Sequence, residues 1–396
     1  MGSYNIEVKK IRKAGDVMIY LDNAATTFPK PKSVYDNVMK AMKEYGANPG
    51  RGSHAMAMKG AKIIYETREL LAELFNLEDP MNVIFTSNAT DSLNIAIKGI
   101  LKPGDHVITT TMEHNSVLRP IKELEKFGVE NTIVLCKIDG SIDVADIENA
   151  IKSNTKLIVT THASNLTGTI FPIEKIGALC KKHNITYLLD AAQSAGVLDI
   201  DVQKYNIGIL SVPGHKGLLG PQGTGVLLIN SDIEIDTIKQ GGTGSESSSL
   251  YQPNFYPDKL EAGTHNLPGI AGLNSGIKYI LNEGTKSIYS HEKELVDTFI
   301  KEIRNNKKIL IYGPESLENR CGVVPINIFD MDSSEVAYIL DSKYNIAIRS
   351  GLHCAPLAHQ TIGTEKIGAV RFSVGPFNKK SEIIIAAKAL NEISNL

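Results

Sequence analysis

The chain has 396 residues, which is long enough for two compact regions and a large hydrophobic core. Its 42 Lys and Arg residues nearly balance 44 Asp and Glu residues, which leaves a formal net charge of -2. This balance argues against a nucleic-acid partner, because electrostatic binding of a polyanion requires a basic surface. The four cysteines lie far apart and lack metal-ligand spacing. We therefore expect reduced thiols in a cytoplasmic protein that binds no metal.

The N-terminal residues and the overall hydropathy bear on targeting. Residues 1–17 are basic and polar, and they lack the apolar core of a secretory signal. No later segment is long and apolar enough to span a membrane. The sequence therefore predicts a globular protein without a membrane partner.

Helices and short apolar runs alternate through the first two thirds of the chain. Helices are expected in "PKSVYDNVMKAMKEYG", which opens at Pro31 and stops at Gly46, and in "AKIIYETRELLAELF". Seven aliphatic runs follow: "NVIFTS", "HVITTT", "TIVLC", "KLIVTTH", "ITYLLD", "IGILSV" and "GVLLI". Because these runs show no polar alternation, we expect a mostly parallel seven-stranded sheet that helices cover on both faces. This predicts a large α/β domain over residues 32–276.

The pattern changes from about residue 277 onward. A long helix near Ser287–Asn305 precedes the short runs "KILIYG", "VVPINIF", "IAIRSG" and "GAVRFSVG", and "SEIIIAAKALNEIS" predicts a last helix. Residues 277–396 are therefore expected to form a smaller α+β domain. Before this change, "GGTGSESSS" (Gly241–Ser249) is typical of a surface loop.

Polar residues follow several of the expected strands, at the edge where open α/β sheets bind ligands. Ala89 and Thr90 follow the first run at the start of a helix, where free backbone N–H groups can bind an anion. His114 and Asn165 follow two later runs, and Asp190 ends another, where burial is costly without a cationic or donor partner. Taken singly, each of these residues has an ordinary structural explanation such as helix capping.

The stretch "VPGHKGLLGPQGTG" (Val212–Gly225) adds Lys216 between a histidine and a run rich in glycine. An anion site, a buried carboxylate and a lysine amine at one edge of a sheet are the groups that pyridoxal 5'-phosphate requires. The alternative is a nucleotide-binding α/β protein, but no GxGxxG follows the first strand and no GxxxxGKS or GxxxxGKT is present. We therefore predict pyridoxal phosphate as the cofactor and Lys216 as its covalent anchor.

Several motifs carry a resemblance that covers nearly the whole chain, from "IYLDNAATT" (Ile19–Thr27) to "GAVRFSVGPFNKKSEI". Between these lie, in order, "TSNATDSLN", "MEHNSV", "HASNLTGT", "LLDAAQSAG", "GHKGLLGPQGTG", "EAGTHN" and "RSGLHCA". With these motifs in this order, the chain resembles the cysteine desulfurases within the class V aminotransferase family. The resemblance implies the type I pyridoxal phosphate fold. It also implies that residues 18–31 lie near the active site and associate with the small domain.

The resemblance assigns roles to residues at matching positions. Lys216 would bind pyridoxal phosphate as a Schiff base, and Cys354 would accept sulfur from the substrate as a persulfide. Thr264 would reach the phosphate from the partner subunit, which implies a homodimer with shared active sites. Contacts with the phosphate are implied for Ala89, Thr90 and His215. On the cofactor ring, His114 would stack and transfer protons, Asp190 would pair with the pyridine nitrogen, and Gln193 would bond the phenolic oxygen. The substrate carboxylate would be held by Arg371 and by Asn165, which also contacts the cofactor.

The implied reaction converts L-cysteine to L-alanine. Because only a thiolate is a good nucleophile, His353 or the cofactor is expected to take the proton of Cys354. The compact segment "RSGLHCAPLAHQ" resembles the group with a short cysteine loop, which implies an accessory sulfur-acceptor protein. One position departs from the family: Pro213 stands where a Ser or Thr hydroxyl is common, and we expect weaker cofactor binding or compensation by neighbouring groups.

Two alternatives remain open at this point. The same site could act on L-selenocysteine as a selenocysteine lyase, or on another amino acid as a different lyase of class V. A second class would be a pyridoxal-phosphate-binding regulator or scaffold without turnover. The presence of both Lys216 and Cys354, and the lack of a fused DNA-binding segment, argue against that second class.

Overall fold

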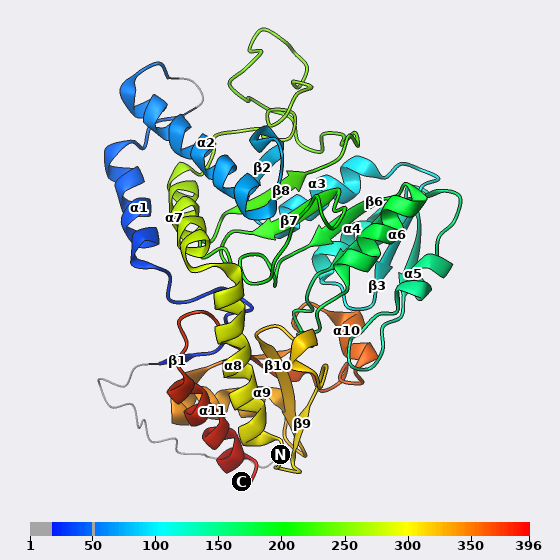
Figure 1. The fold of residues 1–396 in the computed structure, drawn as a ribbon, viewed down its shortest axis with the longest axis vertical. Helices are drawn as coiled ribbons and strands as arrows, with labels where there is room; N and C mark the ends of the chain where they lie inside the picture. Colours follow the sequence, from blue (N-terminus) through cyan, green and yellow to red (C-terminus); the bar gives the residue numbers. More distant parts are fainter. Residues whose placement is uncertain (1–17, 50–51) are drawn as a thin grey trace, which may run out of the picture.

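The computed structural model describes residues 18–49 and 52–396, so the basic leader lies outside the described residues. A seven-stranded sheet forms the centre of the larger part of the molecule (Figure 1). All seven aliphatic runs form its strands, which confirms the expected α/β fold: Val83–Thr86 (β2), His106–Thr110 (β3), Glu130–Val134 (β4), Thr155–Thr161 (β5), Thr186–Asp190 (β6), Ile209–Pro213 (β7) and Gly225–Ile229 (β8).

The strand order is β2-β8-β7-β6-β5-β3-β4, and the strands are parallel except for β8, which runs antiparallel to β2 and to β7. The parallel strands from β3 to β7 therefore end at one edge of the sheet, as the ligand-site argument requires. Helices surround the sheet at Lys32–Glu44 (α1), Ala55–Phe75 (α2), Ala89–Ile100 (α3), Asn115–Glu125 (α4), Val144–Asn149 (α5), Ile173–His183 (α6) and Leu267–Glu283 (α7).

Neighbouring residues of one strand pack into different apolar clusters on the two faces of this sheet. In β6, Leu188 belongs to a cluster with Leu93 of α3 and Val117 of α4, whereas Leu189 belongs to a cluster with Leu71 of α2. Successive side chains of a strand point to opposite faces, so a strand covered on both sides needs apolar residues at every position. This explains why the seven runs lack polar alternation.

The smaller part of the molecule contains a four-stranded antiparallel sheet with the order β12-β13-β10-β9. Helices α8, α9 and α11 supply apolar side chains such as Phe299, Leu340 and Leu390 to its cluster. These elements are Thr285–Ile303 (α8), Ile309–Ile311 (β9), Val323–Ile328 (β10), Ser333–Tyr344 (α9), Ile346–Ala347 (β11), Arg349–Gly351 (β12), Pro356–Thr361 (α10), Ala369–Ser373 (β13) and Lys380–Ile393 (α11). The expected boundary after residue 276 falls inside α7, so the division at that residue stays a prediction.

The N-terminal segment contacts both parts of the molecule. Strand β1 (Ile19–Tyr20) pairs in parallel with β11 of the smaller part. Farther along, Lys30 Nζ donates a hydrogen bond to the carbonyl oxygen of His215 at 2.6 Å, and the Thr27 N–H donates to the same oxygen at 3.2 Å. The segment therefore lies against the turn that carries Lys216. None of the helices in the described ranges combines the length and apolar character needed to cross a membrane.

Arg320 joins the loop after β5 to the smaller sheet. Its side chain is buried and donates to the carbonyl oxygens of Thr167, Tyr312, Pro314 and Val323 at 2.7–3.3 Å. We expect Arg320→Met to destabilise the protein by about 3 kcal/mol or more, because several buried carbonyl groups would lose their donors. Urea denaturation measures the effect.

The exposed Arg304 on the end of α8 supplies the control for this prediction, since Arg304→Met removes the same charge without uncovering buried carbonyl groups. The two variants should differ clearly in their denaturation midpoints. Equal midpoints would mean that the carbonyl contacts of Arg320 contribute little to stability.

Candidate active site

One cavity of about 250 Å³ lies at the edge of the sheet where the parallel strands end. Loops after β2, β3, β5, β6 and β7 line it, and residues from the N-terminal segment and from the smaller part of the molecule complete its wall. Of the residues assigned from the sequence, all but Thr264 line this cavity: Ala89, Thr90, His114, Asn165, Asp190, Gln193, His215, Lys216, Cys354 and Arg371. Positions spread over the whole chain therefore meet at one site.

Lys216 lies on the turn that follows β7. Burial, and secondarily the charge of Arg371, lower the pKa of its amine to about 8. Within the described part of the chain, its Nζ atom makes no hydrogen bond or ion pair. An amine with a lowered pKa that is free of partners is suited to attack a carbonyl group near neutral pH. Lys216 therefore fits the role of a covalent anchor for an aldehyde cofactor.

Asp190 ends β6 and is 3 % exposed. Burial raises the pKa of its carboxyl group, although the Ala192 N–H, which donates to Oδ1 at 3.0 Å, opposes this shift. A buried carboxylate with so few donors is costly unless a cation binds beside it. The protonated nitrogen of a pyridine ring is such a cation, so the site fits pyridoxal phosphate at this position.

Glu113 is a second buried carboxyl group near Asp190, and the sequence analysis gave it no role. The Thr110 hydroxyl donates to its Oε1 at 2.6 Å, while its Oε2 is buried without a partner in the described residues. Burial raises the pKa of Glu113 to about 8, and the nearby charge of Asp190 adds to this effect. Burial therefore favours the protonated form of Glu113, whereas the Ala192 N–H and the charge of Lys216 favour the charged form of Asp190.

The start of α3 has the features of an anion site. Asn88 caps the helix by accepting from the Asp91 N–H at 2.9 Å, while the N–H groups of Ala89 and Thr90 have no partner in the described ranges and lie at the cavity. Nδ1 of His215 is also buried without a partner. Free N–H groups at a helix N-terminus beside an unpaired ring nitrogen fit a phosphate group.

His114 caps the start of α4, where its Nδ1 accepts from the Ser116 N–H at 3.0 Å. Burial and the neighbouring Lys216 lower the pKa of the ring to about 4. The ring is therefore neutral, and its proton lies on Nε2. The Ser116 hydroxyl lies 2.8 Å from His114 Nδ1 and 2.7 Å from the Thr90 hydroxyl, which links the histidine to the anion site. Stacking of His114 on a cofactor ring stays a prediction.

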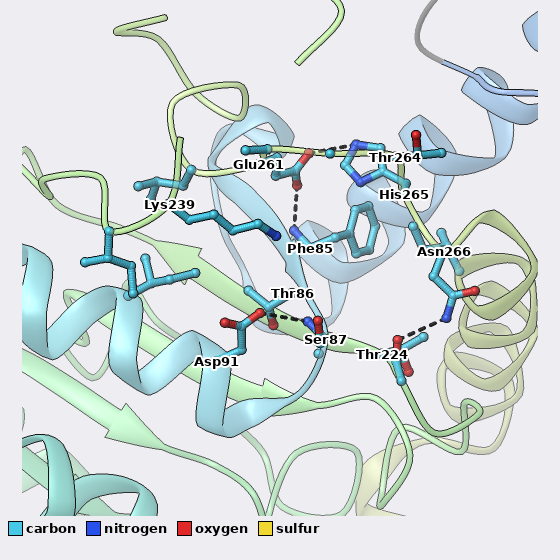
Figure 2. Close-up of a pocket in the computed structure, with 18 residues that line it drawn as sticks. Phe85, Thr86, Ser87, Asp91, Thr224, Lys239, Glu261, Thr264, His265 and Asn266 are labelled. Carbon is cyan, nitrogen blue, oxygen red and sulfur yellow. Dashed lines mark hydrogen bonds and ion pairs between the residues drawn. The ribbon is translucent and has the colours of Figure 1, made fainter. Parts of the chain in front are cut away.

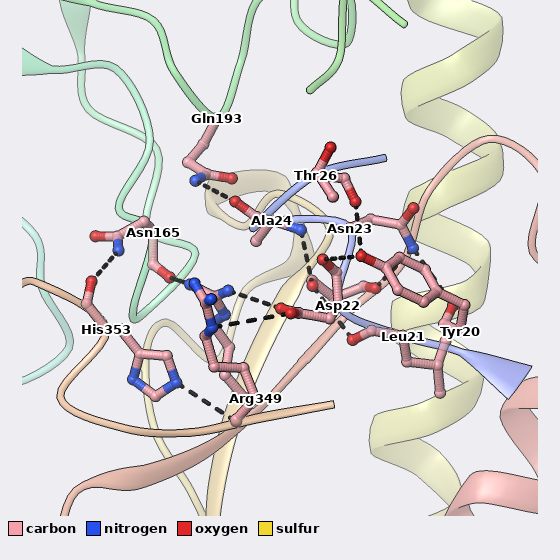
Figure 3. A network of polar contacts seen from close by, with 12 residues as sticks. Tyr20, Leu21, Asp22, Asn23, Ala24, Thr26, Asn165, Gln193, Arg349 and His353 are labelled. Carbon is pink, nitrogen blue, oxygen red and sulfur yellow. Dashed lines mark hydrogen bonds and ion pairs between the residues drawn. The ribbon is translucent and has the colours of Figure 1, made fainter. Parts of the chain in front are cut away.

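Arg371 lies in β13 and is 2 % exposed. Figure 3 shows Asp22, Asn165 and Arg349, which belong to the same network of polar contacts. Its Nη2 pairs with Asp22 Oδ1 at 2.9 Å, its Nη1 donates to the Asn165 carbonyl oxygen at 3.0 Å, and its Nε is buried without a partner in the described residues. Arg349 Nε approaches the other oxygen of Asp22 at 3.8 Å. Asp22 therefore faces two guanidinium groups at the site. Sequence reasoning missed both Asp22 and Arg349, although the motifs "LDNAATT" and "RSGLHCA" contain them.

Cys354 is exposed at the opening of the cavity, on the short segment between β12 and α10. Both Cys354 and His353 have left-handed backbone conformations, with φ of +55° and +49°. Two contacts fix this segment: the Asn115 N–H donates to the Cys354 carbonyl oxygen, and Asn165 Nδ2 donates to that of His353, each at 2.8 Å. Gln193 forms a separate link to the N-terminal segment through the Ala24 carbonyl oxygen at 3.1 Å.

Thr264 lies elsewhere in this chain. It lines a different cavity of about 210 Å³, where Figure 2 shows it beside His265 and Glu261. Glu261 is buried and accepts from the Phe85 N–H at 2.6 Å, from Arg68 at 2.6 Å and from His265 at 3.1 Å. These contacts fix the start of the "EAGTHN" loop on β2. A single chain thus does not bring Thr264 to the site of Lys216, and its role across a subunit interface stays a prediction.

Comparisons with known proteins agree with this geometry. The family model for class V aminotransferases matches residues 19–385. The chain is 34 % identical over 384 residues to a probable cysteine desulfurase of Methanothermobacter thermautotrophicus, covering 96 % of this chain and 95 % of the relative. It is also 34 % identical over 395 residues to a probable cysteine desulfurase of Pyrococcus abyssi, covering 98 % and 97 %.

Among solved structures, the apo cysteine desulfurase of Thermococcus onnurineus superposes with a TM-score of 0.90 at 33 % identity, covering 96 % of this chain and 95 % of that one. This confirms the type I pyridoxal phosphate fold, and the family accounts for the cofactor that the site fits. The chain therefore belongs to the class V aminotransferase family.

Proposed function

We propose that this protein is a pyridoxal-phosphate-dependent cysteine desulfurase, which converts L-cysteine to L-alanine and transfers the sulfur to Cys354. One observation carries the proposal: the exposed thiol of Cys354 and the half-buried Lys216 side chain line the same cavity. Lys216 alone would support many reactions of amino acids, whereas a thiol at the same cavity favours sulfur transfer. The relatives named cysteine desulfurases support the same activity.

The bound cofactor supplies an electron sink for the bonds at the amino acid's Cα. In our proposal, Lys216 would anchor the cofactor, and its amine would move protons at the substrate Cα. Asp190 keeps the pyridine nitrogen protonated, and Arg371 binds the substrate carboxylate through its planar donor face. Asp22 and the Asn165 carbonyl each engage one terminal nitrogen of Arg371, which leaves Nε and the second N–H of each terminal nitrogen as donors.

The sulfur-transfer step follows from the position of Cys354. Its thiolate attacks the substrate sulfur, which forms an S–S bond and breaks the substrate Cβ–S bond. The electron pair of the broken bond remains on the carbon fragment, which takes up a proton and leaves as alanine. Cys354 is left as a persulfide, so the thiol of the enzyme plus cysteine give a persulfide plus alanine.

The decisive experiment incubates the purified protein with L-cysteine and measures alanine and persulfide on the Cys354 peptide after one turnover. Equal amounts of alanine and persulfide are expected. L-selenocysteine and other β-substituted amino acids, tested alongside, separate a desulfurase from a selenocysteine lyase or another class V lyase. A protein that binds the cofactor without any turnover would instead be a regulator or scaffold, and the proposal would be wrong.

We also propose a homodimer in which Thr264 completes the partner's phosphate site. Lys216→Ala and Thr264→Ala proteins should each be inactive at a limiting cofactor concentration. After mixing and subunit exchange, about a quarter of the wild-type rate should return, because half of the dimers are mixed and each has one intact site. Activity of the mixture and sedimentation of the dimer are the measurements. Full activity in a monomer would exclude shared sites.

Three finer points belong to the same proposal. The short segment around Cys354 is fixed at two carbonyl groups, which supports a separate sulfur-acceptor protein that comes to the thiol. Pro213 lines the cavity and lacks the hydroxyl group that is common at its position in the family. The unpaired Nδ1 of His215 can compensate for that hydroxyl in binding the phosphate. A cytoplasmic location stays a prediction from the cysteine usage.

A further inference from the structure

Two histidines and a threonine form a buried chain behind Cys354. His353 Nδ1 lies 3.4 Å from His359 Nε2, His359 Nδ1 lies 2.7 Å from the Thr364 hydroxyl, and His353 Nε2 lies 3.5 Å from the Arg349 carbonyl oxygen. All three side chains are buried. Figure 3 shows His353 between Arg349 and Asn165, and His353 also lines the cavity.

The two imidazole rings lie end to end. Their planes differ by 10°, and their centroids are 5.6 Å apart, far more than the 3.4 Å between the two nitrogens. The centroids are therefore separated mainly along the line that joins the two nitrogens, and the two near-parallel rings lie in nearly the same plane. In this arrangement the N–H of one ring points along the lone pair of the other. This is the geometry of a ring-to-ring hydrogen bond and differs from face-to-face stacking.

Two backbone carbonyl groups bear on the proton positions in the chain, that of Arg349 beside His353 and that of Thr364 beside His359. A carbonyl oxygen can only accept, so His353 Nε2 carries the proton and donates to Arg349. Burial lowers the pKa of His353 to about 3 and that of His359 to about 4, so both rings are neutral. We assign the proton of His359 to Nε2, so that His353 Nδ1 accepts from it and His359 Nδ1 accepts from the Thr364 hydroxyl. The competing arrangement has the proton on His359 Nδ1, where it faces the Thr364 carbonyl group.

This arrangement bears on the expected base for Cys354. Both nitrogens of His353 are engaged, one as a donor to Arg349 and one as an acceptor from His359. Neither is free to take a proton from the thiol. In this arrangement His353 has no free lone pair, which favours the cofactor, the other expected base for Cys354; the choice between the two stays a prediction.

We propose that His359 and Thr364 are positioning residues: through His353 they fix the backbone conformation that presents the Cys354 thiol to the substrate. His353 and Cys354 both have left-handed φ angles, which L-residues with a Cβ adopt only under constraint. Asn165 donates to the carbonyl oxygen of His353, and the Asn115 N–H donates to that of Cys354. The histidine chain fixes the side chain of His353. A purely apolar residue would fill the space of His359 without setting the orientation of His353.

The test uses two matched pairs of variants. Thr364→Val keeps the shape of the side chain but removes the hydroxyl that donates to His359 Nδ1. Thr364→Ser keeps this hydroxyl. His359→Phe fills the site without nitrogen atoms, whereas His359→Gln retains an amide donor toward His353. Thermal melts identify any variant that fails to fold. If Thr364→Val or His359→Phe fails to fold, the other of these two variants and its matched control provide the comparison.

The inference rests on the proposed desulfurase, but two readouts are independent of that activity. In wild-type protein labelled with 15N-histidine, both rings should have the Nε2–H form. The rate at which iodoacetamide alkylates Cys354 should differ at least several-fold between the wild-type and Thr364→Val proteins. For the loaded enzyme, single-turnover persulfide formation should fall about 10- to 100-fold in Thr364→Val and His359→Phe, with little change in cysteine affinity. Thr364→Ser and His359→Gln should recover most of the rate.

The outcomes separate the two proposals. If the wild-type protein forms no persulfide, the proposed function fails, yet the tautomer and alkylation measurements still decide whether the histidine chain exists. A proton on His359 Nδ1 would overturn the inference. So would unchanged alkylation and persulfide rates in a folded Thr364→Val protein.

Discussion

Cys354→Ala protein should keep its cofactor and still bind L-cysteine, while alanine formation falls by about three orders of magnitude or more. The reason is that the substitution removes the sulfur atom that attacks the substrate and leaves the groups around Lys216 in place. Cofactor retention is measured by absorbance, cysteine binding by the change in that absorbance, and alanine by chromatography. The thiol is exposed in the cavity wall, so replacement by alanine is not expected to unfold the protein.

Two other cysteines provide matched controls for this prediction. Cys136 and Cys180 lie outside the cavity, and burial raises the pKa of their thiols to about 11 and about 12. Cys136→Ala and Cys180→Ala should therefore keep most of the wild-type rate, apart from a small packing effect. If Cys354→Ala turns over cysteine as fast as these controls do, sulfur leaves the substrate by elimination and the proposed mechanism is wrong.

The second large effect is expected for Lys216→Ala, which should lose covalent cofactor binding and at least about a thousandfold of its activity. Borohydride treatment of the wild-type protein should attach the cofactor permanently to the peptide that contains Lys216, and peptide mapping locates the adduct. The exposed Lys181 in α6 is the control, since Lys181→Ala should keep both the adduct and the rate. An adduct on a different lysine would contradict the assignment of the anchor.

The pH dependence of cofactor attachment gives an independent check on Lys216. Only the neutral amine attacks an aldehyde, and the pKa of this amine is lowered to about 8 by burial and by Arg371. In cofactor-free protein, the rate of attachment should therefore rise about tenfold per pH unit below pH 8 and level off above it. A rate that keeps rising above pH 10 would show that Lys216 has an ordinary amine pKa.

The sheet could be predicted because its strands are buried on both faces, which produces uninterrupted aliphatic runs. Most of the site could be predicted for a related reason: parallel strands place the residues that follow them at one edge, so Asp190 and Lys216 meet without any knowledge of the packing. The division into domains was harder to place, since the expected boundary falls within a continuous helix.

The remaining features depend on contacts that no spacing encodes. Asp22 pairs with Arg371 across nearly the full length of the chain, and the raised pKa of Glu113 follows from its burial. His353 was one of two groups, with the cofactor, expected to take the proton of Cys354, because it precedes that residue. Its engagement by His359 depends on how α10 packs, which the residue order alone does not reveal.

The pairing of Asp22 with Arg371 also bears on when the protein becomes competent during its synthesis. Asp22 leaves the ribosome well before its partner in β13, which lies 349 residues later in the chain. A nascent chain can fold its large sheet around the Lys216 turn earlier, with the Asp22 carboxylate still unpaired. The guanidinium group proposed to bind the substrate carboxylate is absent until β13 joins the smaller sheet. An incomplete chain could therefore hold a cofactor before it could act on an amino acid.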